Sequence, residues 1–264
     1  MNSPLISVIT VVRNRDAVVE RCLKSVLNQT FTNFEYLVKD GNSTDKTVEI
    51  LKKYEKQFSY FETSPDKSLY DAMNIAAQHA TGEWLCYIQS DDQLFDSQVF
   101  EKIAPYLEKS AADIVYGTAQ LEFDWGVIKT LKANPIGTIW NHMPFCHQAM
   151  FQRTALAKKY PFDLTYRSAA DYDQVYKLYA LGHAFEIAPV MVAKLSAGGL
   201  SDTKRISGLK EVGVIKKKYD TNKWHHFLHA LYVAKSDIRL RIRNLLPTTI
   251  VKKIFQLREK INEK

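Results

Sequence analysis

The chain has 264 residues, of which 46% are hydrophobic and 25% charged, with a formal net charge of +7. These values suit a globular protein with one large α/β domain, or one domain and an appendage. They argue against a membrane-spanning protein, because no run of about 18 apolar residues occurs. The three scattered cysteines argue against a disulfide framework. We therefore expect a protein of the reducing cytoplasm without a signal peptide.

Strand-like and helix-like segments alternate through the first half of the sequence. Strands are predicted from continuous or β-branched apolar runs at residues 5–12, 34–38, 58–62, 84–88 and 114–116. Helices are predicted from apolar residues at helical spacing at residues 18–27, 48–54, 69–79 and 98–108. This βα order predicts an α/β fold with a mostly parallel, Rossmann-like sheet flanked by helices.

The second half is less regular. The expected elements are a hairpin or surface excursion at 121–131, a strand at 147–151, a helix at 171–181 and a strand at 184–193. The chain from residue 204 onward is predicted to be helical and interrupted at Pro247. We predict one domain over residues 1–203, with a division after residue 118, and a separate tail over residues 204–264.

The positive charge is concentrated in that tail. Residues 204–264 contain 16 Lys/Arg and 5 Asp/Glu, a net charge of +11, whereas residues 1–203 sum to −4. Basic residues such as Arg239 and Lys252 interleave with Ile250 and Ile254, which predicts a basic amphipathic helical tail. Such helices lie on anionic membranes, and a helix that packs back on the domain is the alternative. Nucleic acid is not an expected partner, because the segment has no recognisable reader motif.

Three carboxylates directly follow predicted strands. Asp91 and Asp92 follow the strand at 84–88, and Asp40 follows the strand at 34–38. Adjacent carboxylates repel each other and are costly to bury, and a divalent cation removes that cost. An exposed turn of helix-capping acids is an equally open interpretation of the pair, and Asp40 could instead form an Asx turn. Because ligands of open α/β sheets bind at the carboxyl ends of strands, the three together favour a nucleotide pocket.

Five motifs in order resemble the inverting glycosyltransferases of family 2, which have the GT-A fold. They are SVITVVRN at 7–14, DGNSTD at 40–45, SPDKSLYDAMN at 64–74, TGEW at 81–84 and QSDD at 89–92. The resemblance extends over about residues 5–200. It implies nucleotide-sugar binding in the 1–118 part and acceptor binding in the 119–203 part.

The resemblance also implies roles for single residues. Nucleotide-sugar contacts are expected at Thr10, Val12, Asn14, Asp40, Asp66, Asn74 and Asp91, and Asp92 is expected to ligate Mn²⁺ or Mg²⁺. The family pattern often has an acid where Gln89 stands, so the pair Asp91 and Asp92 would hold the ion here.

A second acidic motif, at 169–173 (AADYD), resembles the one that supplies the family's catalytic base. Asp171 is the predicted base, and Asp173 is the competing candidate, pointing away from it at helical spacing. An acid that complements the helix dipole is the structural alternative for Asp171. His147 falls on the expected acceptor side, although a lone histidine is more often a satisfied structural group. The histidines at 225, 226 and 229 are interpreted as a solvated helix face, and Trp224 as a core or interface residue.

The predicted function is a metal-dependent, inverting transfer of a sugar from a nucleotide-diphospho sugar to an acceptor hydroxyl. The resemblance implies bacterial surface polysaccharide or glycolipid synthesis, with a sugar or lipid-linked acceptor, in the cytoplasm at the inner face of the cell membrane. A nucleotidyltransferase is one alternative, but the segment after the first strand lacks the glycines of a phosphate loop. A catalytically inactive nucleotide-sugar-binding module is the other.

Overall fold

The computed structural model describes residues 3–123, 126–196 and 205–245. Its first half is a parallel sheet in the order β3-β2-β1-β4. These strands are β1 (Ile6–Val12), β2 (Phe34–Asp40), β3 (Tyr60–Thr63) and β4 (Trp84–Tyr87). The intervening helices are α1 (Val19–Leu27), α2 (Thr47–Tyr54), α3 (Leu69–His79) and, after β4, α4 (Val99–Lys109). The predicted βα order is confirmed over this half.

The second half continues the same sheet in the order β4-β8-β6-β9-β5, with β7 paired to β6. Its strands are β5 (Gln93–Leu94), β6 (Ile114–Glu122), β7 (Ile128–Leu131), β8 (Met150–Arg153) and β9 (Phe185–Ser196). β6 and β9 are parallel, whereas β8 runs antiparallel to both β4 and β6. β6 and β7 form the predicted hairpin around residues 121–131. The predicted strand at 147–151 is wrong in its first part, because His147–Ala149 is a 3-10 turn (η3) that precedes β8.

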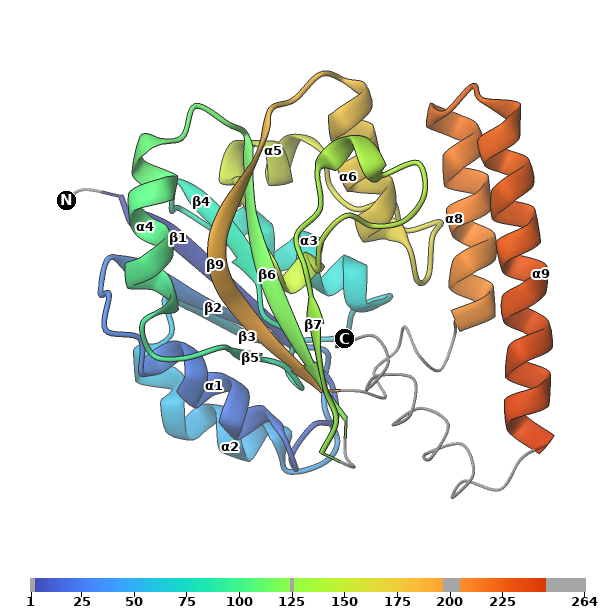
Figure 1. Cartoon of the computed structure of the whole chain (residues 1–264). Helices are drawn as coiled ribbons and strands as arrows, with labels where there is room; N and C mark the ends of the chain where they lie inside the picture. The colour runs from blue at the N-terminus through green and yellow to red at the C-terminus, as the bar shows by residue number, and fades with distance from the viewer. Residues whose placement is uncertain (1–2, 124–125, 197–204, 246–264) are drawn as a thin grey trace.

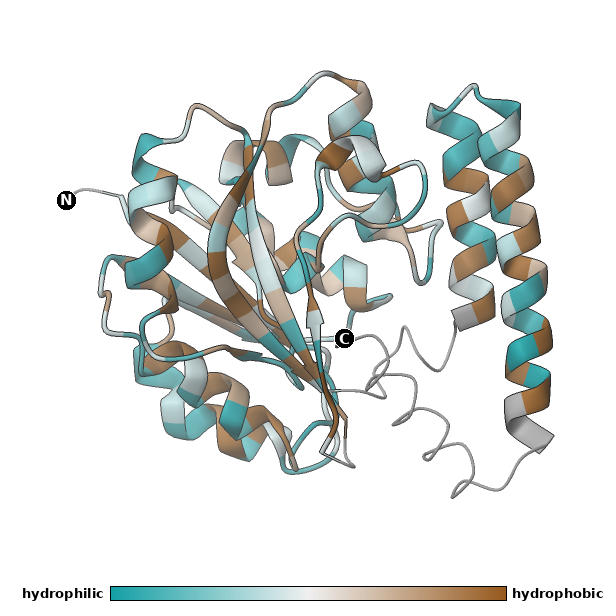
Figure 2. Ribbon diagram, in the orientation of Figure 1, coloured by the Kyte–Doolittle hydropathy of each residue, from teal (hydrophilic) through white to brown (hydrophobic). Residues whose placement is uncertain are grey.

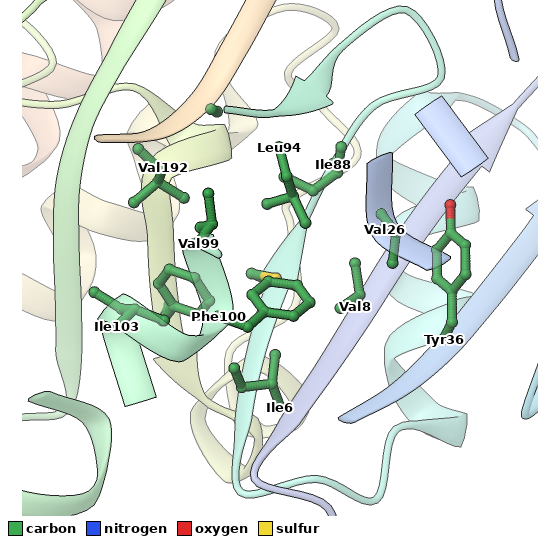
Figure 3. Close-up of a cluster of buried hydrophobic side chains, with 14 of the residues drawn as sticks. Ile6, Val8, Val26, Tyr36, Ile88, Leu94, Val99, Phe100, Ile103 and Val192 are labelled. Carbon is green, nitrogen blue, oxygen red and sulfur yellow. The ribbon is translucent and has the colours of Figure 1, made fainter. Parts of the chain in front are cut away.

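Helices cover both faces of the sheet (Figure 1). All seven residues of β1 are buried, as expected of a central parallel strand. Ile6 and Val8 point towards α1 and α4, and Ile9 and Val11 towards α3, because strand side chains alternate between faces. Figure 3 shows the first of these clusters, in which Phe100 of α4 packs beside Ile6. The opposite face is covered by α3, α5 (Thr154–Lys159) and α6 (Ala170–Ala180).

The C-terminal part that is described forms two helices, α8 (Arg205–Tyr219) and α9 (Lys223–Leu245). α8 packs against α6, and α9 packs against α8, so α9 is the outermost layer on that side (Figure 1). No helix within 3–123, 126–196 and 205–245 is long and apolar enough to cross a membrane. The predicted helical tail is thus confirmed as far as residue 245, and its remainder, including Pro247, lies outside the described residues.

Candidate active site

A cavity of about 440 Å³ opens at the carboxyl ends of β1 and β4, where the parallel sheet predicts a ligand. Its lining combines cations from the loop after β1, the start of α3, the carboxylates after β4, and residues next to β8 and at the end of β9. These residues are Val11, Val12, Arg13, Arg15, Asp66, Ser68, Leu69, Ala72, Gln89, Ser90, Asp91, Asp92, Leu121, Gln148, Leu195 and Ser196. Of the residues expected to bind the nucleotide sugar or the metal, the cavity lining includes Val12, Asp66, Asp91 and Asp92.

Asp92 is the most deeply buried carboxylate of this cavity, with 5% of its surface exposed. Its Oδ2 accepts a hydrogen bond of 2.9 Å from Gln148 Nε2, and its Oδ1 one of 3.3 Å from the backbone N–H of Ser196. Burial, together with the neighbouring charge of Asp91, raises the pKa of Asp92 to about 7. Both hydrogen-bond donors are neutral, so they do not cancel the charge that Asp92 acquires when it ionises.

The carboxylate pair fits a magnesium or manganese ion that substrate phosphates help to bind. Within the described ranges, no group of three or more His, Cys, Asp or Glu side chains gathers as a ready-made metal site. Mg²⁺ is usually held by one or two carboxylates, with substrate phosphates and water completing its octahedral shell. Asp91 and Asp92 provide that number of oxygen ligands, and a cation would offset the cost of burying ionised Asp92.

Asp66 reaches the cavity because the loop after β2 passes directly beneath it. A Cβ atom on Gly41 would lie 2.3 Å from Asp66 Oδ2, so the contact requires a glycine at position 41. Burial raises the pKa of Asp66, while the charges of Lys39 and Arg13 act in the opposite direction. Lys39 is fully buried and donates hydrogen bonds to the carbonyl oxygens of Asp40 and Ser64, which holds β2 to the loop that carries Asp66.

Asp40 and Asn14 shape the rim of the site instead of lining the cavity. Asp40 is fully buried and accepts hydrogen bonds from the backbone N–H and the hydroxyl of Ser43, three residues further on, which fixes the start of the loop after β2. Asn14 adopts a left-handed backbone conformation, with φ of 52°, and its Oδ1 accepts a hydrogen bond of 2.8 Å from the N–H of Thr44. Together these bonds tie the loop after β1 to the loop after β2.

Thr10 and Asn74 do not line the cavity, and their polar atoms are engaged elsewhere. The contact of both residues with the nucleotide sugar stays a prediction. Thr10 lies on the α1 face of β1, and its hydroxyl is 2.8 Å from both Ile88 O and the Tyr36 hydroxyl. Strand alternation directs the side chain of Thr10 into the core between β1 and α1. Asn74 uses both ends of its amide on the backbone of Phe162, at 2.9 Å each. Its role in this structure is to fasten the loop before α6 to α3.

Asp171 stands at the first turn of α6, where Tyr70 of α3 meets it. The Tyr70 hydroxyl donates a hydrogen bond of 3.0 Å to Asp171 Oδ1, and the N–H of Tyr172 donates to the same oxygen. No hydrogen bond within the described ranges engages Asp171 Oδ2. α3 presents Tyr70 because Ser68 caps its N-terminus by accepting from Asp71 N–H, while Asp71 accepts from Lys67 N–H.

Asp173 has a different environment from Asp171. It is buried, with 4% of its surface exposed, and its Oδ1 accepts hydrogen bonds from Lys218 Nζ at 3.0 Å and from the Tyr219 hydroxyl at 3.1 Å. Asp173 therefore attaches α8 to α6. Asp171 differs in that it is only half-buried and forms no ion pair among the described residues, so its carboxylate is the more accessible of the two.

His147 packs in the interior and not on an open surface. Its ring stacks on Tyr87, with centroids 5.4 Å apart, and only 8% of the residue is exposed. Nε2 is buried without a hydrogen-bond partner among the described residues, and burial lowers the pKa of His147. The acceptor role of His147 stays a prediction. Burial, together with the charges of Asp92 and Asp171, raises the pKa of the adjacent Cys146 thiol to about 12.

Several residues of this site were not expected from the sequence. Gln148 and Ser196 reach Asp92 from segments 56 and 104 residues away, and no local pattern predicts such contacts. Tyr70 lies within the motif at 64–74, but its contact with Asp171 depends on how α3 and α6 pack. Arg13 and Arg15 could have been recognised as cations directly after a strand that ends at the predicted nucleotide edge.

Comparison with known proteins agrees with this geometry. The family model described as glycosyl transferase family 2 matches residues 7–169. A PGL/p-HBAD biosynthesis glycosyltransferase of Mycobacterium bovis is 33% identical over 181 residues, which cover 66% of this chain and 69% of the relative. The putative glycosyltransferase EpsE of Bacillus subtilis is 30% identical over 164 residues, or 59% of each chain.

Solved structures confirm the GT-A type of fold. S. aureus TarS 1–349 in complex with UDP-GlcNAc aligns with a TM-score of 0.62 and 20% identity, over 84% of this chain and 69% of that one. The mannosyltransferase PcManGT from Pyrobaculum calidifontis, in complex with GDP-Man and Mn²⁺, aligns with a TM-score of 0.62 and 15% identity, over 88% and 65%.

Proposed function

Because the chain belongs to glycosyl transferase family 2, we propose that it moves a sugar from a nucleotide-diphospho sugar to an acceptor hydroxyl with inversion at the anomeric carbon. The observation that carries this proposal is the placement of Asp91 and Asp92 in a cavity at the carboxyl edge of the sheet. The start of α3 lines the same cavity, and α3 also contacts Asp171 through a hydrogen bond. Family membership favours glycosyl transfer over nucleotidyl transfer.

The donor would lie in the cavity with its diphosphate between the carboxylate pair and the exposed guanidinium groups of Arg13 and Arg15. Two arginines opposite a diphosphate make charge-assisted hydrogen bonds, and they offset the negative charge that the leaving group gains. Val12, at the end of β1, and Asp66, in the loop after β3, also line this cavity. Glycosyltransferases of the same fold bind UDP-GlcNAc or GDP-Man, which supports a nucleotide-sugar donor here.

Asp91 and Asp92 would hold Mn²⁺ or Mg²⁺. When bound, the ion would supply Lewis-acid stabilisation of the diphosphate leaving group. The remaining chemistry falls to the chain itself: Arg13 and Arg15 orient the phosphates, and Gln148 fixes the rotamer of Asp92 through its 2.9 Å hydrogen bond.

Asp171 would act as the general base. Its Oδ1 is occupied by Tyr70 and by the N–H of Tyr172, so Oδ2 is the oxygen that takes the proton of the acceptor hydroxyl. The acceptor oxygen attacks the anomeric carbon from the face opposite the diphosphate, and the configuration inverts. One carboxylate base is sufficient for this displacement, whereas a glycosidase needs a pair.

The acceptor would be a sugar or a lipid-linked sugar of a bacterial surface polysaccharide or glycolipid. Support for this class comes from the relatives, among which is a PGL/p-HBAD biosynthesis glycosyltransferase. A lipid-linked acceptor would place the enzyme in the cytoplasm, peripheral on the inner face of the membrane, where the basic residues of 204–264 meet anionic headgroups.

The direct test is a thermal-shift screen of nucleoside diphosphates and nucleotide sugars with and without Mn²⁺, followed by transfer assays with the donors that bind. A true donor stabilises the folded chain by mass action, and Mn²⁺ should increase that shift. Nuclear magnetic resonance of the product then gives the anomeric configuration. Retention would exclude the single-displacement mechanism. Binding without any turnover, over a broad acceptor panel, would instead support the inactive binding module.

A further inference from the structure

The outermost helix, α9, has apolar side chains on two opposite faces. Its inner face packs on α8, where buried His229 donates from Nε2 to Leu209 O at 2.9 Å and faces Lys216 through Nδ1 at 3.1 Å. α8 is in turn fixed to the body, because Lys216 Nζ donates to Asn141 O and Lys218 pairs with Asp173. The predicted solvated face of histidines is therefore wrong for His229, which belongs to this inner packing.

The outer face of α9 is also apolar. We call it the α9 stripe, and it follows alternating intervals of four and three residues: Trp224, Leu228, Leu231, Lys235, Ile238 and Ile242. Its five apolar members are between 36% and 62% exposed, and Phe227 and Tyr232 extend it on either side with 51% and 45% exposure. Such spacing puts the six residues on one side of an α-helix over about 27 Å.

This concentration is unusual within the molecule. Eight of the fifteen large hydrophobic side chains that are exposed in the described residues belong to α8 and α9. Hydrophobic residues recur along both helices (Figure 2). A helix that is apolar on opposite faces is normally covered on both. Within the described ranges only the α8 side of α9 is covered, so the α9 stripe has no apolar partner among those residues.

Charge distinguishes the two candidate partners. The charged side chains on or beside the α9 stripe are cations, Lys235, Arg239 and Lys223, all of them exposed. The one acid between Lys223 and Ile242, Asp237, lines the groove between α8 and α9 and accepts a hydrogen bond from Arg241 at 2.9 Å. In a dimer joined along the α9 stripe, the cations of the two copies would face each other, and the stripe lacks the acidic flanking residues that pair with such cations in coiled coils. On an anionic lipid surface, the same cations would pair with headgroup phosphates.

The composition of the stripe also suits a bilayer interface. Trp224 and Phe227 stack at its N-terminal end, with ring centroids 5.2 Å apart, and Tyr232 lies one to two turns further on. Aromatic side chains of this kind sit at the level of lipid headgroups, and Lys and Arg extend their charged ends to the phosphates. Because no described helix can cross a membrane, the expected geometry is a helix lying in the plane of the interface.

We propose that the α9 stripe is the surface by which this protein docks on an anionic lipid bilayer, with α9 parallel to the membrane plane. The proposed function includes a membrane contact, and this proposal assigns that contact to a specific surface. It rests on the proposed function only for the identity of the acceptor. It places the contact on α9 between residues 224 and 242, where Trp224, Leu231 and Ile238 enter the apolar boundary and Lys235 and Arg239 face headgroup phosphates.

The test is co-sedimentation of the full chain with vesicles of phosphatidylcholine, with and without phosphatidylglycerol, at low and high salt. We expect binding to the anionic vesicles at low salt, and at least a tenfold loss in the triple variant Trp224→Ser, Leu231→Ser, Ile238→Ser. A double variant, Lys235→Gln with Arg239→Gln, should weaken binding to anionic vesicles and remove most of its salt dependence.

The matched control is Leu181→Ser with Ile187→Ser, which removes two comparably exposed apolar side chains on the body. It should bind like the wild-type chain, and thermal unfolding of all variants shows whether each is folded. Quenching of tryptophan fluorescence by brominated lipid, present in the wild type and lost in Trp224→Phe, reports insertion at this residue.

Three results would overturn the proposal. They are equal vesicle binding by wild type and folded triple variant, equal binding to neutral and anionic vesicles, and a dimer in sedimentation velocity that the triple variant abolishes while no vesicles are bound. Vesicle binding is measured without a donor, and donor binding without vesicles, so failure of one does not imply failure of the other.

Discussion

Asp92→Asn should abolish transfer and yet stabilise the metal-free protein at neutral and alkaline pH. Burial raises the pKa of Asp92 to about 7, well above its value in an unfolded chain. Below pH 4, the side chain is protonated in both states and contributes nothing. Between pH 4 and pH 7, the unfolded chain has released a proton that the folded chain retains, so stability falls as pH rises.

The size of the stabilisation expected for Asp92→Asn follows from the same pKa. Each pH unit by which a folded-state pKa exceeds its unfolded value costs about 1.4 kcal/mol once the group is ionised, so about three units cost about 4 kcal/mol above pH 7. Asparagine carries no charge, and its single oxygen can accept from either Gln148 or Ser196 but not from both. The gain is therefore smaller, and about 2 kcal/mol is a reasonable expectation after losing one hydrogen bond.

The assay is urea unfolding of wild type and Asp92→Asn in a chelator, from pH 4 to pH 8. We expect Asp92→Asn to change from a destabilisation of about 2 kcal/mol near pH 4, where only the lost hydrogen bond counts, to a stabilisation of about 2 kcal/mol at pH 8. Asp163→Asn is the control of opposite sign, because hydrogen bonds from the Thr165 hydroxyl and N–H lower the pKa of Asp163. It should be less stable than the wild type by an amount that stays constant from about pH 5 to pH 8, because the pH-dependent window of a lowered pKa lies at and below the unfolded value. A stabilisation by Asp92→Asn that does not change with pH would refute the reasoning.

Four other substitutions separate the remaining roles. Asp171→Asn should lower kcat by about 10² to 10⁴ with donor binding close to normal, whereas Asp173→Asn should chiefly lower the thermal unfolding temperature by releasing Lys218 and Tyr219. A reversed pair of phenotypes would exchange the two assignments. Gly41→Ala should weaken donor binding at little cost in stability, since the new methyl group displaces the flexible carboxylate end of Asp66. A crystal structure of that variant with Asp66 unmoved would contradict this explanation. Tyr70→Phe should lower kcat without changing the KM of the donor.

Local sequence patterns predicted the parallel half of the sheet and the edge at which the site lies. The continuous apolar run of β1 and the helical spacing of apolar residues at 69–79 are local signals, and both elements begin within one residue of the expected position. Thr10 lies on the same face of β1 as Val8, which packs on the α1 side, so strand alternation directs its side chain into the core between β1 and α1. This orientation follows from the sequence once one residue of β1 is assigned to a face.

Other features depend on contacts between distant segments. Asp92 receives its hydrogen bonds from Gln148 and Ser196, so its burial and raised pKa could not follow from the QSDD motif alone. The same holds for α9. Its helical periodicity is visible in the sequence, but which of its faces packs on α8 depends on the buried contact between His229 and Lys216. Without that contact, the exposed stripe could not be distinguished from a core-facing one.

The Tyr70→Phe prediction isolates the hydrogen bond between α3 and the base. The Tyr70 hydroxyl donates to Asp171 Oδ1 at 3.0 Å, which fixes the rotamer of Asp171 and leaves Oδ2 for the acceptor. Its loss should lower kcat by about tenfold with the KM of the donor unchanged, since a hydrogen bond to a charged group is worth about 1.5 kcal/mol. Tyr172→Phe is the control, because that hydroxyl lies on the residue next to Asp171 but donates to Ile139 O instead. It should lower stability and leave kcat unchanged. If Tyr70→Phe lowers kcat no more than Tyr172→Phe does, Tyr70 only supports packing, and the hydrogen bond does not position the base.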